Sequence, residues 1–116
     1  MTKVGLSYKQ TDVAEQWDAI VIGSGLGGLA SAALLSNMGK RVLVLERHYA
    51  IGGFTHTFKR KGYEWDVGVH YVGEVHRERS VLGQLFGHIT DGRLEWEHMG
   101  EVYDRIVFGD EEYPFR

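Results

Sequence analysis

The feature that most constrains this chain is a glycine-rich turn that directly follows a short apolar run. The apolar run covers Ala19 to Ile22, and the turn reads Gly23-Ser24-Gly25-Leu26-Gly27-Gly28. Four consecutive apolar residues before a turn are typical of a buried strand. The alanine-rich segment that follows predicts a helix over residues 27–38, with Gly39 as its left-handed cap. The sequence therefore predicts a strand that turns sharply into a helix at these glycines.

The segment after this helix supplies a second strand and an acidic residue. Residues 41–45 are mostly apolar, and Glu46 follows directly. A strand–helix–strand crossover of this length makes the two strands parallel. The residues expected on the apolar face of the helix are Leu29, Ala32, Ala33 and Leu35. The predicted fold class is therefore α/β, a Rossmann-like βαβ dinucleotide-binding unit to which the rest of the chain adds antiparallel strands.

Each glycine of the turn has a separate physical role in such a unit. Gly23 takes the tight turn, Gly25 lets a pyrophosphate approach the backbone, and Gly28 lets the helix pack closely on the strands. The helix N-terminus offers unpaired N–H groups and a partial positive charge to the phosphates. The residues of this turn that we expect to bind the cofactor are Gly23, Ser24, Gly25, Leu26, Gly27 and Gly28. The alternative is a glycine-rich turn without a ligand.

The acid and a second glycine pair extend the candidate site. Glu46 lies about 20 residues beyond the turn, where a carboxylate accepts hydrogen bonds from ribose hydroxyls. A carboxylate there also repels a 2′-phosphate, which disfavours NADP, but it suits NAD and FAD equally. Gly52-Gly53 follows shortly after. This pair is either a second close approach of the backbone to a long cofactor or a simple turn.

Composition excludes several classes of protein. The net charge is −3 and no basic run occurs, so nothing indicates nucleic-acid binding. The chain has no cysteine, which excludes disulfides, thiolate catalysis and iron–sulfur clusters, and its histidines lack metal-ligand spacing. It has no apolar run of ~18 residues and no signal peptide. We therefore expect a cytoplasmic protein, with a peripheral membrane contact left open, and a flexible leader over residues 1–16 before a domain at 17–116.

The remaining segments predict several shorter elements. They are a strand over 54–58, a basic turn at 59–62, a strand and irregular loop in 63–73, a Ser80-capped helix to Ile89, a strand at 94–97, and a hairpin from 102–108 and 113–115. His70 in the irregular loop is either a proton-donating group or a structural histidine, and the structural reading is preferred. No catalytic residue is assigned.

Taken together, these motifs resemble one enzyme superfamily. Beyond the fingerprint Gly23, Gly25, Gly28, Ala32, Gly39 and Glu46, the chain has Ile51-Gly52-Gly53 and the segment Gly62, Asp66-Val67-Gly68-Val69-His70-Tyr71-Val72-Gly73. The stretch Tyr103-Asp104-Arg105-Ile106-Val107-Phe108 is also similar. The chain resembles the FAD-dependent amine oxidase and phytoene desaturase superfamily, and within it the retinol saturase and carotenoid isomerase branch.

The resemblance implies a function and further site residues. The family saturates, desaturates or isomerises polyene double bonds with FAD, so the implied substrate is an apolar polyene. By resemblance, Glu46 binds the adenosine ribose beside Arg47, and Gly53, with Gly52 next to it, lines the middle of FAD. Val69, His70 and Tyr71 approach the ribityl chain or the flavin ring.

The chain is much shorter than members of that family, which carry a substrate domain. We therefore expect an incomplete nucleotide-binding layer, a fragment that alone lacks full catalysis, and open sheet edges that favour a partner chain or self-association. Two other readings stay open: an NAD-dependent dehydrogenase domain, and a non-catalytic module that binds a nucleotide or a partner.

Overall fold

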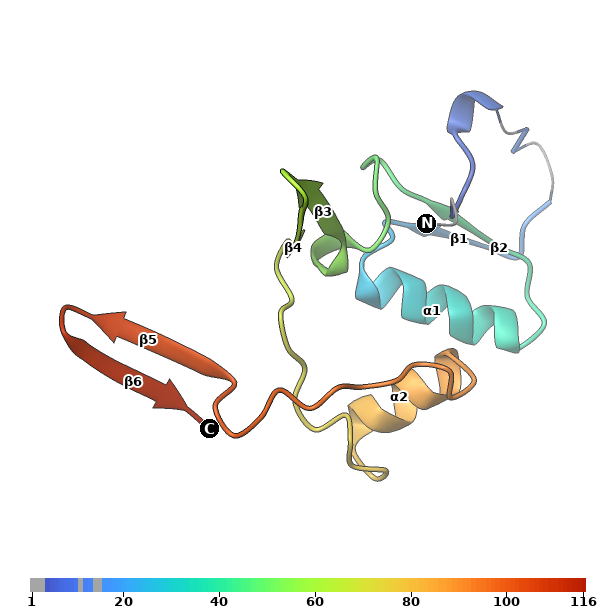
Figure 1. Cartoon of the computed structure of the whole chain (residues 1–116). Helices are drawn as coiled ribbons and strands as arrows, with labels where there is room; N and C mark the ends of the chain where they lie inside the picture. Colours follow the sequence, from blue (N-terminus) through green and yellow to red (C-terminus); the bar gives the residue numbers. More distant parts are fainter. Residues whose placement is uncertain (1–3, 11, 14–15) are drawn as a thin grey trace. The chain divides into compact units, whose positions relative to one another are not determined.

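The computed structural model describes residues 4–10, 12–13 and 16–116 (Figure 1). Its contacts divide the chain into two compact units, Met1–His70 and Tyr71–Arg116. The first unit includes a short 3-10 helix, η1 (Tyr8–Gln10). The flexible leader stays a prediction, because residues 1–3, 11 and 14–15 lie outside the described ranges. The single domain at 17–116 also stays a prediction.

The centre of the first unit is the predicted parallel strand–helix–strand unit. It consists of β1 (Ala19–Ile22), α1 (Leu26–Asn37) and β2 (Val42–Leu45). The two strands are parallel, and Ala19 pairs with Val42 while Ile22 pairs with Leu45. Gly39 has φ +77°, a backbone conformation that suits glycine after a helix. The α/β prediction and the helix cap are therefore confirmed.

α1 runs alongside the paired strands β1 and β2 (Figure 1), and the side chains that it buries are small. Ala30 and Ala32 are buried, Ala33 and Leu35 are half-buried, and Leu29 is 37% exposed. The expected apolar face was therefore wrong at Leu29 and missed Ala30. The reason is the closeness of the packing, because an ideal Cβ on Gly28 would lie only 3.4 Å from the Val21 side chain. At such separations alanine fits between helix and strand, and larger side chains lie at the edge.

The glycine pair after β2 begins a 3-10 turn, so the predicted strand at 54–58 is wrong at residues 54–56 and correct only at residues 57 and 58. Gly52 adopts the left-handed conformation, with φ 115°, and η2 (Gly53–Thr55) follows. The amide and hydroxyl of Thr55 both donate to the Gly52 carbonyl, at 3.0 and 2.7 Å, which closes the turn. η2 ends at Thr55, and the following strand begins at Thr57.

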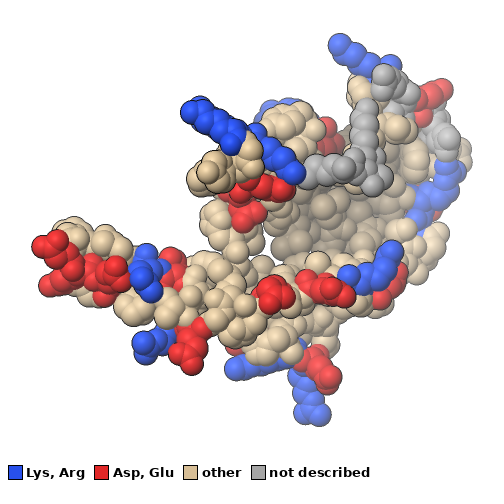
Figure 2. Space-filling model, in the orientation of Figure 1, with Lys and Arg blue, Asp and Glu red and all other residues tan. Residues whose placement is uncertain are grey.

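An antiparallel hairpin then completes the first unit. It pairs β3 (Thr57–Arg60) with β4 (Tyr63–Asp66). The predicted basic turn is shorter than expected, because only Lys61 and Gly62 form it. Figure 2 shows blue Lys and Arg side chains on this hairpin, where Lys59 forms an ion pair with Glu64 at 3.1 Å. Within the described ranges, no helix combines the length and apolarity needed to cross a membrane.

The second unit contains one helix and one hairpin. α2 (Val81–Ile89) begins at Ser80, whose hydroxyl accepts a hydrogen bond from the Gly83 amide at 2.9 Å, as predicted. β5 (Asp104–Phe108) pairs antiparallel with β6 (Glu111–Phe115). The strand expected at 94–97 is absent from the described structure. Its apolar residues pack on α2 instead, with the Trp96 ring centroid 5.2 Å from that of Phe86.

Candidate dinucleotide-binding site

The turn between β1 and α1 has the geometry that its glycines predict. Gly23 has φ +99°, and its amide donates to the Leu45 carbonyl at 2.8 Å, which anchors the turn on β2. An ideal Cβ on Gly28 would lie 2.2 Å from the Gly23 carbonyl oxygen. No real side chain tolerates that distance, so glycine at position 28 is a packing requirement here.

The outer side of the same turn is open. No heavy atom would lie within 4 Å of an ideal Cβ on Gly23, Gly25 or Gly27. Gly25 is the N-cap of α1 and no side chain caps this helix end. The first amides of a helix have no acceptor within the helix, and together they favour an anion. Leu26, in the first turn, is 43% exposed. The first amides of α1 therefore lie beside glycines whose Cβ positions are unobstructed.

Glu46 lies directly beside this turn, and the turn itself holds its carboxylate. Its Oε2 accepts hydrogen bonds from the Ser24 hydroxyl at 2.6 Å and the Ser24 amide at 2.7 Å. Its Oε1 accepts one from the His48 amide at 2.7 Å. These bonds, chiefly that from the Ser24 hydroxyl, lower the Glu46 pKa to about 2. Glu46 is therefore a fixed, ionised acceptor at neutral pH.

The Gly52-Gly53 pair packs against the turn from the other side. The Gly52 amide donates to the carbonyl of Ser24 at 3.0 Å and to its hydroxyl at 3.2 Å. Gly25 and Gly52 form an isolated parallel bridge. An ideal Cβ on Gly53 would lie 2.9 Å from the Gly25 Cα. At the second glycine pair, the backbone of Gly52-Gly53 therefore packs closely against the backbone of Gly25.

The other predicted site residues have fewer links to the turn. Val69, 39% exposed, donates its amide to the Phe54 carbonyl at 3.1 Å. His70 lies 3.7 Å from the Asp66 carboxylate, and both side chains are about half exposed. Arg47 is exposed. The described hydrogen bonds therefore join the turn, Glu46 and Gly52, while Val69 and His70 are tied to η2 and β4.

Sequence reasoning missed two features of this region. The first is the Ser24 side chain, which is 0% exposed and links Glu46 to Gly52. The only signal for it was a hydroxyl inside the glycine turn. The second is an aromatic cluster next to Glu46, in which the ring centroid of His48 lies 4.3 Å from that of Tyr49 and 4.9 Å from that of His56. The sequence shows no metal-ligand spacing for these histidines and gives no signal that would group their rings.

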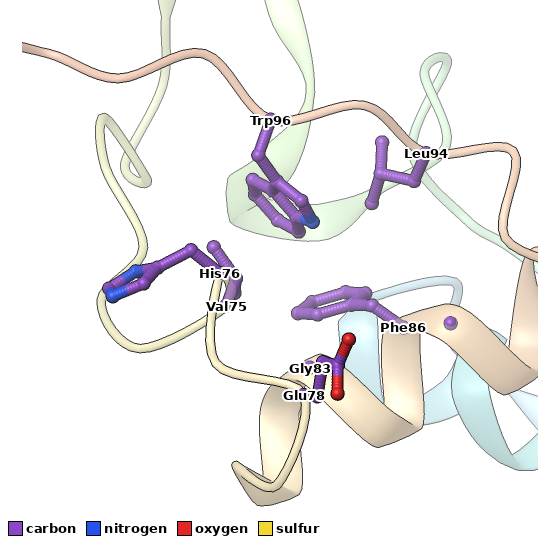
Figure 3. A pocket seen from close by; sticks show the side chains of 8 residues that line it. Val75, His76, Glu78, Gly83, Phe86, Leu94 and Trp96 are labelled. Atoms are coloured by element: carbon purple, nitrogen blue, oxygen red, sulfur yellow. The ribbon is translucent and has the colours of Figure 1, made fainter.

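The second unit has a separate cavity of about 220 Å³ beside α2 (Figure 3). Phe86, Trp96 and Leu94 converge on it, while the His76 imidazole points away from the two aromatic rings. The cavity contains none of the predicted site residues. Within the described part of the chain, no three His, Asp or Glu side chains are grouped so that they could hold a metal ion.

The turn, the open helix end and the acid after β2 define a nucleotide-binding Rossmann-like domain. Residues 21–93 match the family described as "NAD(P)-binding Rossmann-like domain", and the chain belongs to it. Its site is therefore a site for a nucleotide or flavin cofactor.

Several related proteins have names that are more specific than the family description. An all-trans-retinol 13,14-reductase of Danio rerio is 47% identical over 100 residues, which are 86% of this chain and 16% of that protein. An "inactive all-trans-retinol 13,14-reductase" of the same organism is 44% identical over 102 residues, which are 88% of this chain and 17% of that protein. The chloroplastic prolycopene isomerase 2 of an Oncidium hybrid cultivar is 51% identical over 64 residues, which are 55% of this chain and 11% of that protein.

These similarities confirm the expected relationship to the FAD-dependent oxidoreductase superfamily and its retinol saturase and carotenoid isomerase branch. The chain spans less than a fifth of the length of these relatives.

Proposed function

We propose that this chain binds the ADP part of FAD for a flavin-dependent oxidoreductase that acts on apolar polyenes. The observation that carries the proposal is the ionised Glu46 held against the open N-terminal end of α1. Ribose hydroxyls and pyrophosphate are the groups that such a pair recognises. The proposed binding residues are Gly23, Ser24, Gly25, Leu26, Gly27, Gly28, Glu46, Arg47, Gly52 and Gly53, with Val69 and His70 toward the flavin.

FAD is preferred over NAD because of the relatives. Proteins named retinol reductase and prolycopene isomerase share this segment, and their names indicate reactions at polyene double bonds. Bound FAD would supply the hydride chemistry of such a reaction. One relative is named inactive, so similarity in this segment is not by itself a sign of turnover. We propose that the polyene site and catalysis belong to a longer or assembled protein.

The first test is an equilibrium titration of the 116-residue chain with FAD, by flavin fluorescence, and with NAD in parallel. Saturable binding of FAD with NAD inert supports the proposal. Binding of NAD alone favours a dehydrogenase domain, and binding of neither contradicts a nucleotide site in this chain.

A matched pair of variants tests the Glu46 assignment. Glu46→Ala removes the proposed ribose acceptor, whereas Glu101→Ala removes an exposed carboxylate of the second unit with the same change in net charge. Affinity for FAD should fall at least about tenfold in the first variant, as expected for the loss of a hydrogen bond to a charged group, and stay unchanged in the second. Equal affinities would refute the ribose assignment.

A further inference from the structure

The hairpin of β3 and β4 has two chemically different faces. Successive residues of a strand project to opposite faces, and residues directly opposite each other in an antiparallel pair project to the same face. The register pairs Phe58 with Trp65, and Arg60 with Tyr63. These four side chains therefore share one face, and Lys61 lies next to them in the turn. We call these five residues the basic aromatic face.

The aromatic rings of this face are large and largely exposed. Tyr63 is 68% exposed, Trp65 53% and Phe58 40%. The ring centroids of Tyr63 and Trp65 lie 6.5 Å apart, so the two rings are neighbours on the surface. Tyrosine and tryptophan have an apolar body and a polar group, which suits them to a boundary between water and an apolar phase.

The positive charges of this face are separated from the negative charges of the hairpin. Among the residues that the structure describes, neither Arg60 nor Lys61 forms an ion pair. Both acids of the hairpin, Glu64 and Asp66, belong to the opposite face by their register. There Lys59 pairs with Glu64 at 3.1 Å. The basic aromatic face thus combines apolar rings with two cations and no carboxylate.

We propose that the basic aromatic face is the surface through which this chain contacts an anionic membrane. The rings lie at the level of the lipid headgroups, and Arg60 and Lys61 attract the negative headgroups. Nucleic acid also attracts cations and aromatic rings, but two cations beside one turn form no basic stripe, and the chain has a net charge of −3. The inference is independent of the proposed nucleotide site, since contact with lipid needs no FAD.

The first experiment is co-sedimentation of the 116-residue chain, without nucleotide, in a lipid titration. Vesicles of phosphatidylcholine alone are compared with vesicles of phosphatidylcholine mixed with phosphatidylserine. We expect stronger binding to the mixed vesicles, and we expect added salt to weaken it. No binding to the mixed vesicles, or equal binding to both kinds, would overturn the proposal. Binding of a single-stranded oligonucleotide without any binding of vesicles would overturn it in favour of nucleic acid.

A matched pair of charge variants assigns the binding to this face. Arg60→Ala removes a cation of the basic aromatic face, whereas Lys40→Ala removes an exposed cation between α1 and β2. Both change the net charge equally. Affinity for the mixed vesicles should fall about fivefold in Arg60→Ala, as expected for one cation near an anionic surface, and less than about twofold in Lys40→Ala. Equal losses would show that net charge alone matters and would overturn the proposal.

A second pair tests the aromatic rings. Tyr63→Ala removes a ring of the face, and Tyr8→Ala removes one that is 75% exposed in η1. Tyr63→Ala should lower the affinity roughly fivefold, as expected when about half of an aromatic side chain leaves water, and Tyr8→Ala should leave it unchanged. Unchanged binding by a Tyr63→Ala variant that is folded by circular dichroism would overturn the role of the rings. If that variant does not fold, the charge variants still decide.

Discussion

The neighbouring glycines at positions 27 and 28 should respond in opposite ways to the same substitution. Both lie in the first turn of α1, so alanine gains the same intrinsic helix preference at each, roughly 0.5–1 kcal/mol. At Gly27 an added Cβ meets no atom within 4 Å. At Gly28 it would lie 2.2 Å from the Gly23 carbonyl oxygen and 3.2 Å from the carbonyl carbon. The first of these distances is far inside any contact that real Cβ atoms make.

The clash at Gly28 has no inexpensive relief. The obstructing atoms are backbone, and the Gly23 amide is bonded to the Leu45 carbonyl at 2.8 Å, so the turn cannot shift without loosening from β2. Forced overpacking typically costs about 1–3 kcal/mol. Since the helix preference cancels between the two variants, Gly28→Ala should have a free energy of unfolding about 1–3 kcal/mol lower than that of Gly27→Ala. Urea denaturation without nucleotide measures both. A Gly28→Ala variant as stable as Gly27→Ala would refute the close packing described for this turn.

Three further predictions follow from single contacts. Gly53→Ala should lower the unfolding free energy more than Gly62→Ala, because both glycines have positive φ but only at Gly53 does an added Cβ meet backbone, at 2.9 Å; urea midpoints compare them. The Glu46 pKa is about 2 in the folded chain against an ordinary 4.5, so its stabilisation is present above pH 4.5 and is lost as the pH falls from 4.5 to 2. Glu46→Gln should therefore flatten this part of the pH–stability curve, and an unchanged curve would contradict the contacts of this acid. Ser80→Ala should cost about 1 kcal/mol through loss of the α2 cap, as measured by thermal unfolding, whereas no change would show that this cap is dispensable.

The order of elements in the first unit could be predicted because local rules and packing agree there. The apolar runs of β1 and β2, the glycine turn and the Gly39 cap all favour the same strand–helix–strand unit. The predicted strand at 54–58 was wrong at residues 54–56 because Gly52 and Thr55 close a 3-10 turn, which alternation of side chains does not reveal. The predicted strand at 94–97 was wrong because Trp96 packs on Phe86, a tertiary contact that outweighs strand propensity.

In the candidate site, too, some features could be predicted from the sequence and others could not. The positions of Gly23, Gly28 and Glu46 were predictable because each follows from a backbone or charge requirement of the motif. The bonds of Ser24 were not, since a serine hydroxyl bonds to whatever acceptor the fold brings within reach, here a carboxylate 22 residues away.

The most direct test of the dinucleotide site is an amide NMR titration of the nitrogen-15-labelled chain with FAD. The proposed site predicts saturable shift changes at the amides of residues 23–29, 46–48 and 52–53, all grouped around the turn and Glu46. Changes that instead centre on Phe86 and Trp96, around the cavity of the second unit, or that spare the turn altogether, would contradict it.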